Sequence, residues 1–404
     1  MITMAIDNKD KKVLKSSIER EQNEVACSAE CEKIKGSKNL NVPHLRFPEF
    51  TEEWVNVSLK DVADFQKERI SSGLLDESTY ISTENILQNF QGVQSAISIP
   101  ANTNVVAYKK NDILLSNIRP YLKKAWFSDR IGGCSADVFV LRSKTCEPEF
   151  LYNVIASDKF INYVMSGAKG VKMPRGDKNQ MESFSFSIPA VVEQRKISRL
   201  FQLLDERIVT QNKIIEDLKK LKSAISERLL KGVKGSTVLL SDICDIVKGK
   251  QINGENLSES GNYYVMNGGT ELSGYYDDYN VEANTISISE GGNSCGYVQF
   301  NTSPFWSGGH CYSIQDITDN VDNLYLYHYL KSKEDAIMKL RIGSGLPNIQ
   351  KKDLAMFKIK IPAVEQQLKI SIFLSSLERK AEIEERIQNA LLKEKQYLLH
   401  QMFI

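Results

Sequence analysis

The stretch Ile188–Phe201, IPAVVEQRKISRLF, returns almost unchanged as Ile361–Leu374, IPAVEQQLKISIFL. The two strings agree at eight of fourteen positions when Ile188 is aligned with Ile361 without a gap. This alignment, which we call the repeat alignment, also matches three earlier pairs of landmarks: Leu151-Tyr152 and Leu324-Tyr325, Pro174 and Pro347, and Asn111–Ser116 (NDILLS) and Asn284–Ser289 (NTISIS). A start signal shared by two unrelated helices would not reproduce landmarks spread over so much of the chain. The sequence therefore predicts two copies of one unit.

Each copy is expected to open with short strands and loops. Runs rich in Val, Ile, Tyr and Phe, such as Asp137–Arg142 (DVFVLR) and Gly296–Phe300 (GYVQF), alternate with Gly, Asn and Ser. This pattern is typical of short strands joined by turns. Apolar residues spaced three and four apart then predict one helix in each copy, over Glu149–Gly167 and over Asn323–Leu340.

A much longer helix is expected after Pro189 and after Pro362, because proline is tolerated ahead of a first turn but not inside a helix. Beyond each proline, apolar residues recur at a spacing of about 3.5 over about 35 to 40 residues, and Gly232 and Gly235 end the first run. A core helix of a globular domain is the plainer interpretation, but such helices rarely exceed about 25 residues. Two long helices at equivalent places in a repeat predict an antiparallel coiled coil.

Composition limits the class of protein. With 404 residues, of which 42% are apolar and 25% charged, the chain has the content of folded domains with their own cores. The apolar runs are too short for a membrane span or a secretion signal, so we expect a cytoplasmic protein with no membrane partner. Seven scattered cysteines and four histidines show no metal-site spacing, and we expect reduced thiols and no metal or other cofactor. A net charge of +5 over Glu193–Gly235, within a total of +1, permits nucleic-acid binding without demanding it.

Several segments, taken in order, are similar to one known family. Val42–Phe65 (VPHLRFPEFTEEWVNVSLKDVADF) resembles that family's lead-in to a first recognition domain, and a proline followed by Glu-Gln-x-x-Ile is typical of its two helix starts. The second start departs slightly, with Gln366-Gln367 where the first has Glu193-Gln194. Three blocks of the second copy resemble one kind of recognition domain: NGGTELSGYYDDYN (267–280), TISISEGGNSCGYVQF (285–300) and FWSGGHCYSI (305–314). In combination, residues 42–404 resemble the specificity (S) subunit of type I restriction-modification enzymes.

The resemblance implies an α+β fold, in which two similar α/β target recognition domains are separated by two long helices that form an antiparallel coiled coil. Residues 1–43 are polar and are expected to be a poorly ordered tail or a docked helix. The remaining expected parts are a first target recognition domain (44–189), a central conserved spacer helix (190–235), a second target recognition domain (236–362) and a C-terminal conserved spacer helix (363–404).

The resemblance also implies a non-catalytic DNA reader. Each recognition domain would read one half of a bipartite target in double-stranded DNA, and the helices would set the gap between the halves. The implied partners are two copies of the DNA methyltransferase (M) subunit and, through the complex, the restriction/translocase (R) subunit. One alternative is a DNA-cleaving or fused type II restriction-modification enzyme, but the sequence has no Asn-Pro-Pro-Tyr motif and no nuclease carboxylate cluster. The other is a coiled-coil adaptor with no DNA role, which would leave the divergent β-rich halves unexplained.

Cations and amides in loops are the candidate DNA-binding residues, because arginine can bridge two acceptors of guanine, lysine serves phosphates and asparagine matches adenine. In the first copy they are Lys67, Arg69, Arg119, Lys123, Lys124, Lys172, Arg175 and Lys178. In the second copy they are Lys248, Lys250, Asn267, Asn293, Asn348, Lys351 and Lys352. Any one of them is more commonly a solvated surface residue. The loops after Gly170 and Gly343 are the stronger candidates, because they occupy equivalent places in the repeat.

No catalytic residue is predicted. The glycine turns Asn267–Gly269 and Glu290–Gly296 lack the Lys-Ser/Thr pair of a phosphate-binding loop. Cys311 beside His310 has the residue types of a nucleophile and its base. However, the first copy has no matching histidine, and adjacency in sequence does not establish a hydrogen bond.

Overall fold

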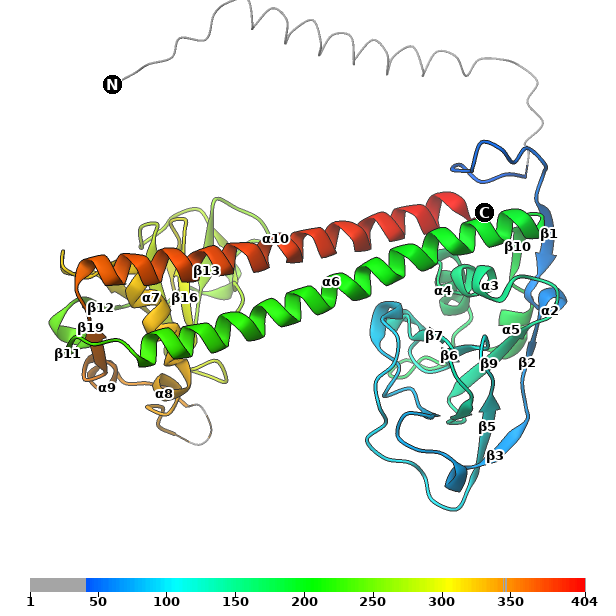
Figure 1. Cartoon of the computed structure of the whole chain (residues 1–404), viewed down its shortest axis with the longest axis horizontal. Coiled ribbons are helices and arrows are strands. Elements are labelled where there is room, and N and C mark those ends of the chain that lie inside the picture. Colours follow the sequence, from blue (N-terminus) through cyan, green and yellow to red (C-terminus); the bar gives the residue numbers. More distant parts are fainter. Residues whose placement is uncertain (1–40, 344, 346, 404) are drawn as a thin grey trace, which may run out of the picture. The chain divides into compact units, whose positions relative to one another are not determined.

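The computed structural model describes residues 41–343, 345 and 347–403, and Figure 1 shows their secondary structure. The predicted polar tail is residues 1–43, and its residues 1–40 lie outside the described residues. The chain forms two compact units. The first contains the residues up to Leu204 and from Lys393 onward, and the second is Asp205–Leu392. Within the described ranges, no helix is both long enough and apolar enough to cross a membrane.

The first unit contains two four-stranded sheets, of order β2-β9-β6-β7 and β3-β5-β8-β4, and the pair β1-β10. Its strands are β1 (Val55–Ser58), β2 (Ala63–Phe65), β3 (Arg69–Ser71), β4 (Tyr80–Ile81), β5 (Asn104–Tyr108), β6 (Ile113–Ser116), β7 (Ala125–Phe127), β8 (Gly132–Cys134), β9 (Val138–Ser143) and β10 (Ser185–Ile188). Its short helices are α2 (Leu59–Val62), α3 (Pro148–Ile155), α4 (Asp158–Ser166) and α5 (Lys178–Glu182).

The second unit contains a four-stranded sheet of order β12-β18-β15-β16, a three-stranded sheet of order β14-β13-β17, and the pair β11-β19. Its strands are β11 (Ser236–Leu239), β12 (Asp245–Lys248), β13 (Tyr263–Met266), β14 (Gly274–Tyr276), β15 (Thr285–Ser289), β16 (Val298–Asn301), β17 (Trp306–Ser307), β18 (Cys311–Gln315) and β19 (Lys358–Ile361). Its short helices are α7 (Asn323–Ser332), α8 (Glu334–Met338) and α9 (Lys351–Ala355).

The sheet β2-β9-β6-β7 of the first unit and the sheet β12-β18-β15-β16 of the second repeat each other in strand order and in register. In the first unit, Ile113 of β6 lies opposite Leu141 of β9. Their counterparts in the repeat alignment, Ile286 of β15 and Ile314 of β18, also lie opposite each other. All four side chains are buried, so the same positions of the repeat supply both cores. The predicted duplication of one unit is confirmed.

The prediction of a single helix after the strands is wrong in both copies, because each copy has two short helices there. In the first, the hydroxyl of Ser157 accepts a hydrogen bond from the backbone N–H of Phe160 (3.2 Å) and donates one to the carbonyl of Val154 (2.7 Å). This serine caps the start of α4 in an extended conformation and thereby separates α4 from α3. In the second, Lys333 leaves the helical conformation between α7 and α8.

Two long helices, α6 (Val191–Lys231) and α10 (Val364–Met402), begin after the two prolines as predicted. Within the second unit, Gln211 of α6 donates to the backbone carbonyl (3.0 Å) and the carboxylate (2.6 Å) of Glu384 of α10. Further along α6, Lys222 pairs with Glu378 at 2.5 Å. The partner's number falls as the number in α6 rises, so the helices run antiparallel and side by side (Figure 1). The predicted antiparallel coiled coil is confirmed.

Each long helix begins inside the core of a β-rich unit. Ile197 and Phe201 of α6 are 1% exposed and belong to the first core, together with Trp54 and Phe150. Leu374 of α10 is fully buried in the second core. Burial of the helix starts orders the first turns of helices that are otherwise largely exposed to solvent.

A buried glutamine fixes the first turn of each long helix. The amide of Gln194 donates to the carbonyl of Pro189 (2.8 Å), and its counterpart in the repeat alignment, Gln367, donates to the carbonyl of Pro362 (2.9 Å). Gln194 and Gln367 are 2% and 0% exposed. The repeated string therefore encodes a junction in which a side chain satisfies the carbonyl of the proline that precedes the helix.

The preceding residue differs between the two junctions. Glu193 is 1% exposed and forms a two-pronged ion pair with Arg46, with both N···O distances 2.7 Å. Its counterpart Gln366 is exposed and needs no cation. The charged residue Glu193 is thus found at the junction where this position is buried and paired, and the neutral Gln366 at the junction where it is exposed.

Replacement of Arg46 by Met should destabilise the first unit by about 3–5 kcal/mol, because it leaves the Glu193 carboxylate buried without a partner. The double variant Arg46→Met/Glu193→Gln should lose less, since it removes the buried charge as well. Urea unfolding followed through Trp54 and Trp126 fluorescence measures both. A double variant as unstable as the single one would contradict the account.

A buried histidine ties α7 to α10 in the second unit. His328 is 3% exposed, and its Nε2 lies 2.9 Å from the hydroxyl of Ser375. Burial lowers the pKa of His328 to about 4, because the protonated ring would have to give up its hydration. The fold therefore favours the neutral imidazole.

This burial predicts a pH dependence. The unfolded chain binds a proton at His328 below about pH 6.5 whereas the folded chain does so only below about 4, so stability should fall as the pH drops through that window. The loss approaches about 3 kcal/mol. Thermal unfolding from pH 7.5 to 4 should show a shallower decline for His328→Gln than for the unsubstituted chain. Parallel declines would rule out His328 as the source.

Candidate nucleic-acid interface

The loop after Gly170 is pinned to the end of β6 in the first unit. Gly170 has a φ of +99°, and the backbones of Lys169 and Arg175 exchange two hydrogen bonds of 3.0 and 2.9 Å. The N–H of Arg119 donates to the carbonyl of Pro174 (2.7 Å), and the N–H of Gly176 donates to the carbonyl of Asn117 (3.0 Å). The loop is closed on itself and held against the segment that follows β6.

The same set of backbone bonds recurs in the second unit. Gly343 has a φ of +95°, and Ile342 and Asn348 exchange hydrogen bonds of 2.8 and 3.0 Å. Two further bonds join Gly292 N–H to the carbonyl of Pro347 (3.0 Å) and Ile349 N–H to that of Glu290 (2.8 Å). Every one of these residues is the counterpart, in the repeat alignment, of one in the first loop. We call this repeated arrangement of the loop and the segment that follows β6 or β15 the platform.

The predicted cations of the first unit fall into two groups. Five are exposed: Lys67, Arg69, Arg119, Lys172 and Arg175. Of these, Arg69 donates to the carbonyl of Asn104 (3.0 Å) and Arg175 pairs with Asp137 (2.8 Å). The platform brings Arg119 and Arg175 together through its backbone bonds, whereas Lys67 and Arg69 belong to the β2–β3 connection and to β3.

Three predicted cations are used inside the first unit. Lys123 pairs with Asp158 at 2.5 Å, and Lys124 donates to the carbonyl of Thr83 (2.6 Å). Lys178 pairs with Glu182 (3.3 Å) and lies 5.0 Å above the ring of Phe65. Each would have to exchange an internal contact for a phosphate, so these three lysines are weaker candidates than the exposed ones.

In the second unit, Lys250, Asn293, Asn348, Lys351 and Lys352 are exposed. Asn348 lies on the platform, and Lys351 and Lys352 begin α9 directly after it. Lys248 pairs with Glu290 (2.6 Å), and the side-chain oxygen of Asn267 accepts from the N–H of His310 (3.1 Å). These two bonds bring Lys248 to Glu290 and Asn267 to His310, and the backbone bridge between Gly291 and Asn348 places Asn348 beside Glu290.

Glu290 and His310 were not among the predicted site residues. A comparison of the two copies position by position would have pointed to them, because polar residues of different chemistry, Asn117 and Asp137, stand at their counterparts. Periodicity gives no such signal. Their closeness depends on the pairing of strands that are not adjacent in the chain.

Cys311 does not form a nucleophilic pair with His310. Its thiol is 2% exposed and contacts the carbonyl of Tyr312 (3.6 Å). Burial raises the pKa of Cys311 to about 11, so the reactive thiolate is disfavoured. In the described part of the chain, moreover, no three His, Cys, Asp or Glu residues form a group that could hold a metal ion.

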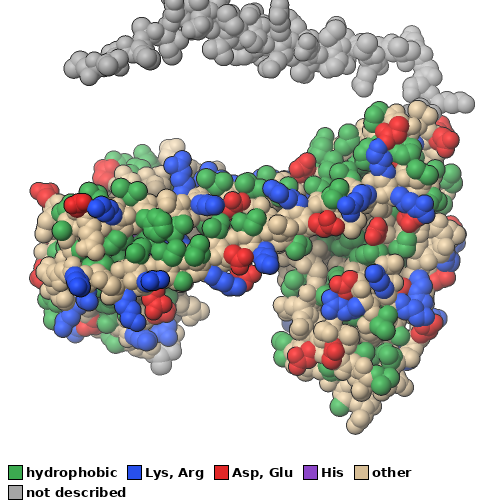
Figure 2. Space-filling view, in the orientation of Figure 1, with side chains coloured by type: hydrophobic (Ala, Val, Ile, Leu, Met, Phe, Trp, Pro, Cys, Tyr) green, Lys and Arg blue, Asp and Glu red, His purple; other side chains and the backbone are tan. Residues whose placement is uncertain are grey.

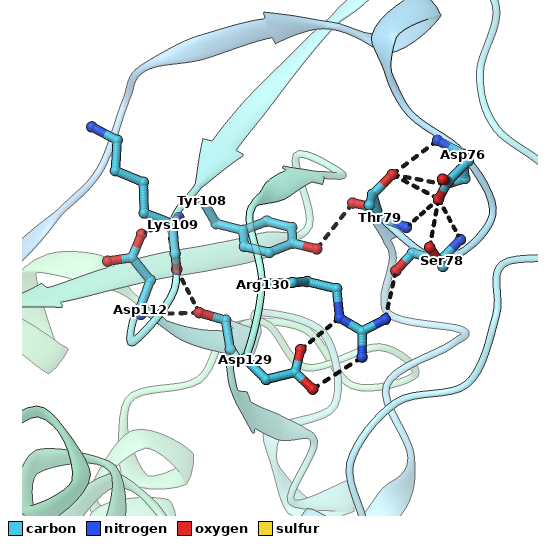
Figure 3. A network of polar contacts seen from close by, with 9 residues as sticks. Asp76, Ser78, Thr79, Tyr108, Lys109, Asp112, Asp129 and Arg130 are labelled. Atoms are coloured by element: carbon cyan, nitrogen blue, oxygen red, sulfur yellow. Dashed lines mark hydrogen bonds and ion pairs between the residues drawn. The ribbon is translucent and has the colours of Figure 1, made fainter.

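Charges of both signs are interspersed over the visible face of each unit, as Figure 2 shows. The first unit also has a polar network that uses a cation structurally (Figure 3). Arg130 forms two hydrogen bonds with Asp129 (2.5 and 3.0 Å) and reaches the carbonyl of Ser78 (3.3 Å), while Tyr108 donates to the carbonyl of Thr79 (3.0 Å). These contacts order the turn at residues 76–79.

Comparison with known proteins gives one family match for each of the two copies. The type I restriction modification DNA specificity domain matches residues 51–220 and 233–393. The MjaVIII type I restriction enzyme specificity subunit of Methanocaldococcus jannaschii is 24% identical over 409 aligned residues, which cover 88% of this chain and 92% of that protein. A Mycoplasma pneumoniae protein named as a type I specificity subunit is 31% identical over 145 residues, which cover 35% of this chain and 38% of that protein. The match to a Mycoplasma genitalium protein named likewise covers 31% of its length.

Two solved structures share the fold. The S subunit of a type I restriction-modification system from M. genitalium superposes with a TM-score of 0.65 at 17% identity, over 90% of this chain and 99% of that one. A chain from a study of complex assembly and conformational transition in a type I system superposes with a TM-score of 0.55 at 19% identity, over 86% and 96%. With both copies matched and the fold shared, the chain belongs to the family of the type I restriction modification DNA specificity domain.

Proposed function

We propose that this chain is the sequence-specific, non-catalytic DNA-recognition subunit of a type I restriction-modification complex and reads a bipartite duplex target, one half-site with each unit. The observation that carries the proposal is the platform, whose backbone hydrogen bonds recur in both units while the side chains at the bonded positions differ. Bases are told apart by hydrogen-bonding side chains, whereas orientation on the duplex comes from the frame that carries them. One frame with two sets of side chains suits the reading of two different half-sites.

The partners would be two copies of the M subunit and, through the complex, the R subunit, with the assembly acting on DNA in the cytoplasm. Membership of the family and the assembly studied for the related type I system support these partners. The exposed cations near the platforms, such as Lys172, Lys351 and Lys352, are suited to phosphate contacts. On the visible face of each unit, Lys and Arg side chains are interspersed with Asp and Glu, which fits local phosphate contacts rather than one broad basic surface (Figure 2).

The first test is binding and methylation. The purified full chain with its M subunits should bind and methylate a duplex that contains one split sequence, mapped beforehand as methylated adenines in host DNA with and without this gene. The chain alone should transfer no methyl group and cut no DNA. Methylation or cleavage by the isolated chain would support a fused restriction-modification enzyme instead, and absence of any bipartite target would support a coiled-coil adaptor.

The second test concerns α6 and α10, which we propose set the number of base pairs between the half-sites. Matched removal of one heptad from each helix, residues 209–215 and 384–390, keeps the paired segments of equal length. It should change the gap in the methylated target and leave both half-site sequences as they were. The measurement is sequencing of methylated sites, with removal of residues 209–215 alone as a comparison. A changed half-site sequence at an unchanged gap would contradict the spacer role.

A further inference from the structure

We propose that three pairs of equivalent positions form the base-recognition set of each unit: 117/290 and 175/348 on the platform, and 137/310 directly before β9 and β18. In each set, some side chains contact bases and the others hold them in position. This inference rests on the proposed function and adds four residues to the predicted ones: Asn117, Asp137, Glu290 and His310. The side chains at these positions are Asn, Asp and Arg in the first unit and Glu, His and Asn in the second.

The backbone of these positions is fixed in the same way in both units. Asn117 donates its N–H to the carbonyl of Asp137 (2.8 Å), and Glu290 donates its N–H to that of His310 (2.9 Å). The isolated bridges Ile118–Arg175 and Gly291–Asn348 add the third position of each set. The backbone therefore holds the three positions in the same way in both units. The two sets differ in which side chains these positions carry.

Glu290 is the clearest sign that the second set awaits a ligand. Its side chain is 9% exposed, and its Oε1 accepts from Lys248 Nζ (2.6 Å) and from the Tyr312 hydroxyl (3.0 Å). Its Oε2 is buried without a hydrogen-bond partner and lies 3.9 Å from Nδ1 of the exposed His310 ring. A buried carboxylate oxygen without a donor is costly, so movement of the His310 ring toward it on DNA binding would recover free energy.

The geometry makes Glu290 a positioning residue and His310 the contacting one. A small movement of the imidazole would allow Nδ1–H to donate to Oε2, which orients the ring and turns Nε2 away from the protein. Asn348, on the adjoining loop, carries the amide that pairs with adenine. The second set thus offers an oriented imidazole and an amide to one half-site.

The first set presents different groups on the same frame. Arg175 is held by Asp137 at 2.8 Å, and the side-chain oxygen of Asn117 is buried without a hydrogen-bond partner, as Oε2 of its counterpart Glu290 is. Equivalent positions in both units thus carry a buried acceptor without a hydrogen-bond partner. A guanidinium oriented by a carboxylate suits guanine, which presents two acceptors in the major groove.

The experiment uses the full chain with its M subunits and a duplex library randomised at both half-sites, with sequencing of the methylated products. His310→Ala and Glu290→Gln should relax preference at one and the same half-site by about tenfold or more, the worth of one good base contact. Asp137→Asn should relax the other half-site. Glu282→Gln and Lys360→Ala, which change exposed side chains of the second unit, should leave both profiles unchanged.

Each outcome decides the matter. The inference is overturned if His310→Ala leaves both profiles unchanged, or if His310→Ala and Asp137→Asn act on the same half-site. Should Glu290→Gln fail to fold, the exposed His310 and Asp137 variants still carry the test. If the unsubstituted complex has no bipartite target, the proposed function itself fails. If the complex has a bipartite target and every variant keeps the same preference at both half-sites, only the assignment of these positions is overturned.

Discussion

The start of each long helix is the constraint on which the rest of the structure depends. A helix of about 40 residues, exposed along most of its length, has little packing of its own to hold it in place. Here its first turns lie in a β-rich core, and a buried glutamine binds the carbonyl of the preceding proline. The direction in which each helix leaves its core is thereby fixed by covalent and hydrogen-bonded connections rather than by surface contacts.

The antiparallel pair uses polar as well as apolar contacts. Gln211 is 1% exposed and bonds to Glu384, between the buried apolar residues Ile208 and Ile215 of α6. A buried polar residue in such a seam penalises any shift of one helix along the other, because the shift would leave its amide unsatisfied. Register along the pair is therefore specified chemically and not by apolar burial alone.

The repeat made much of the fold predictable, since one alignment located both helix starts, both sets of strands and both platforms. What it did not show depends on single contacts. Ser157 divides a segment whose apolar spacing alone predicts one helix. At the candidate site, the sequence identified the cations. It did not show which of them bind an acceptor inside the protein, as Lys124 does through the carbonyl of Thr83. The pairing of Glu290 with His310 required the strand register.

The two junctions have a consequence for how such a chain can change. The hydrogen bonds that start α6 and α10 involve the same residue types at the same relative positions, so the chain has two equivalent points of attachment. A β-rich unit detached at one point carries with it the proline carbonyl that the glutamine needs at the other, and only the Arg46–Glu193 pair is specific to one junction. Under the proposed function, novel pairs of half-sites would then arise by exchange of whole gene segments at these points, without remodelling either platform, while substitutions inside a platform would alter one half-site at a time.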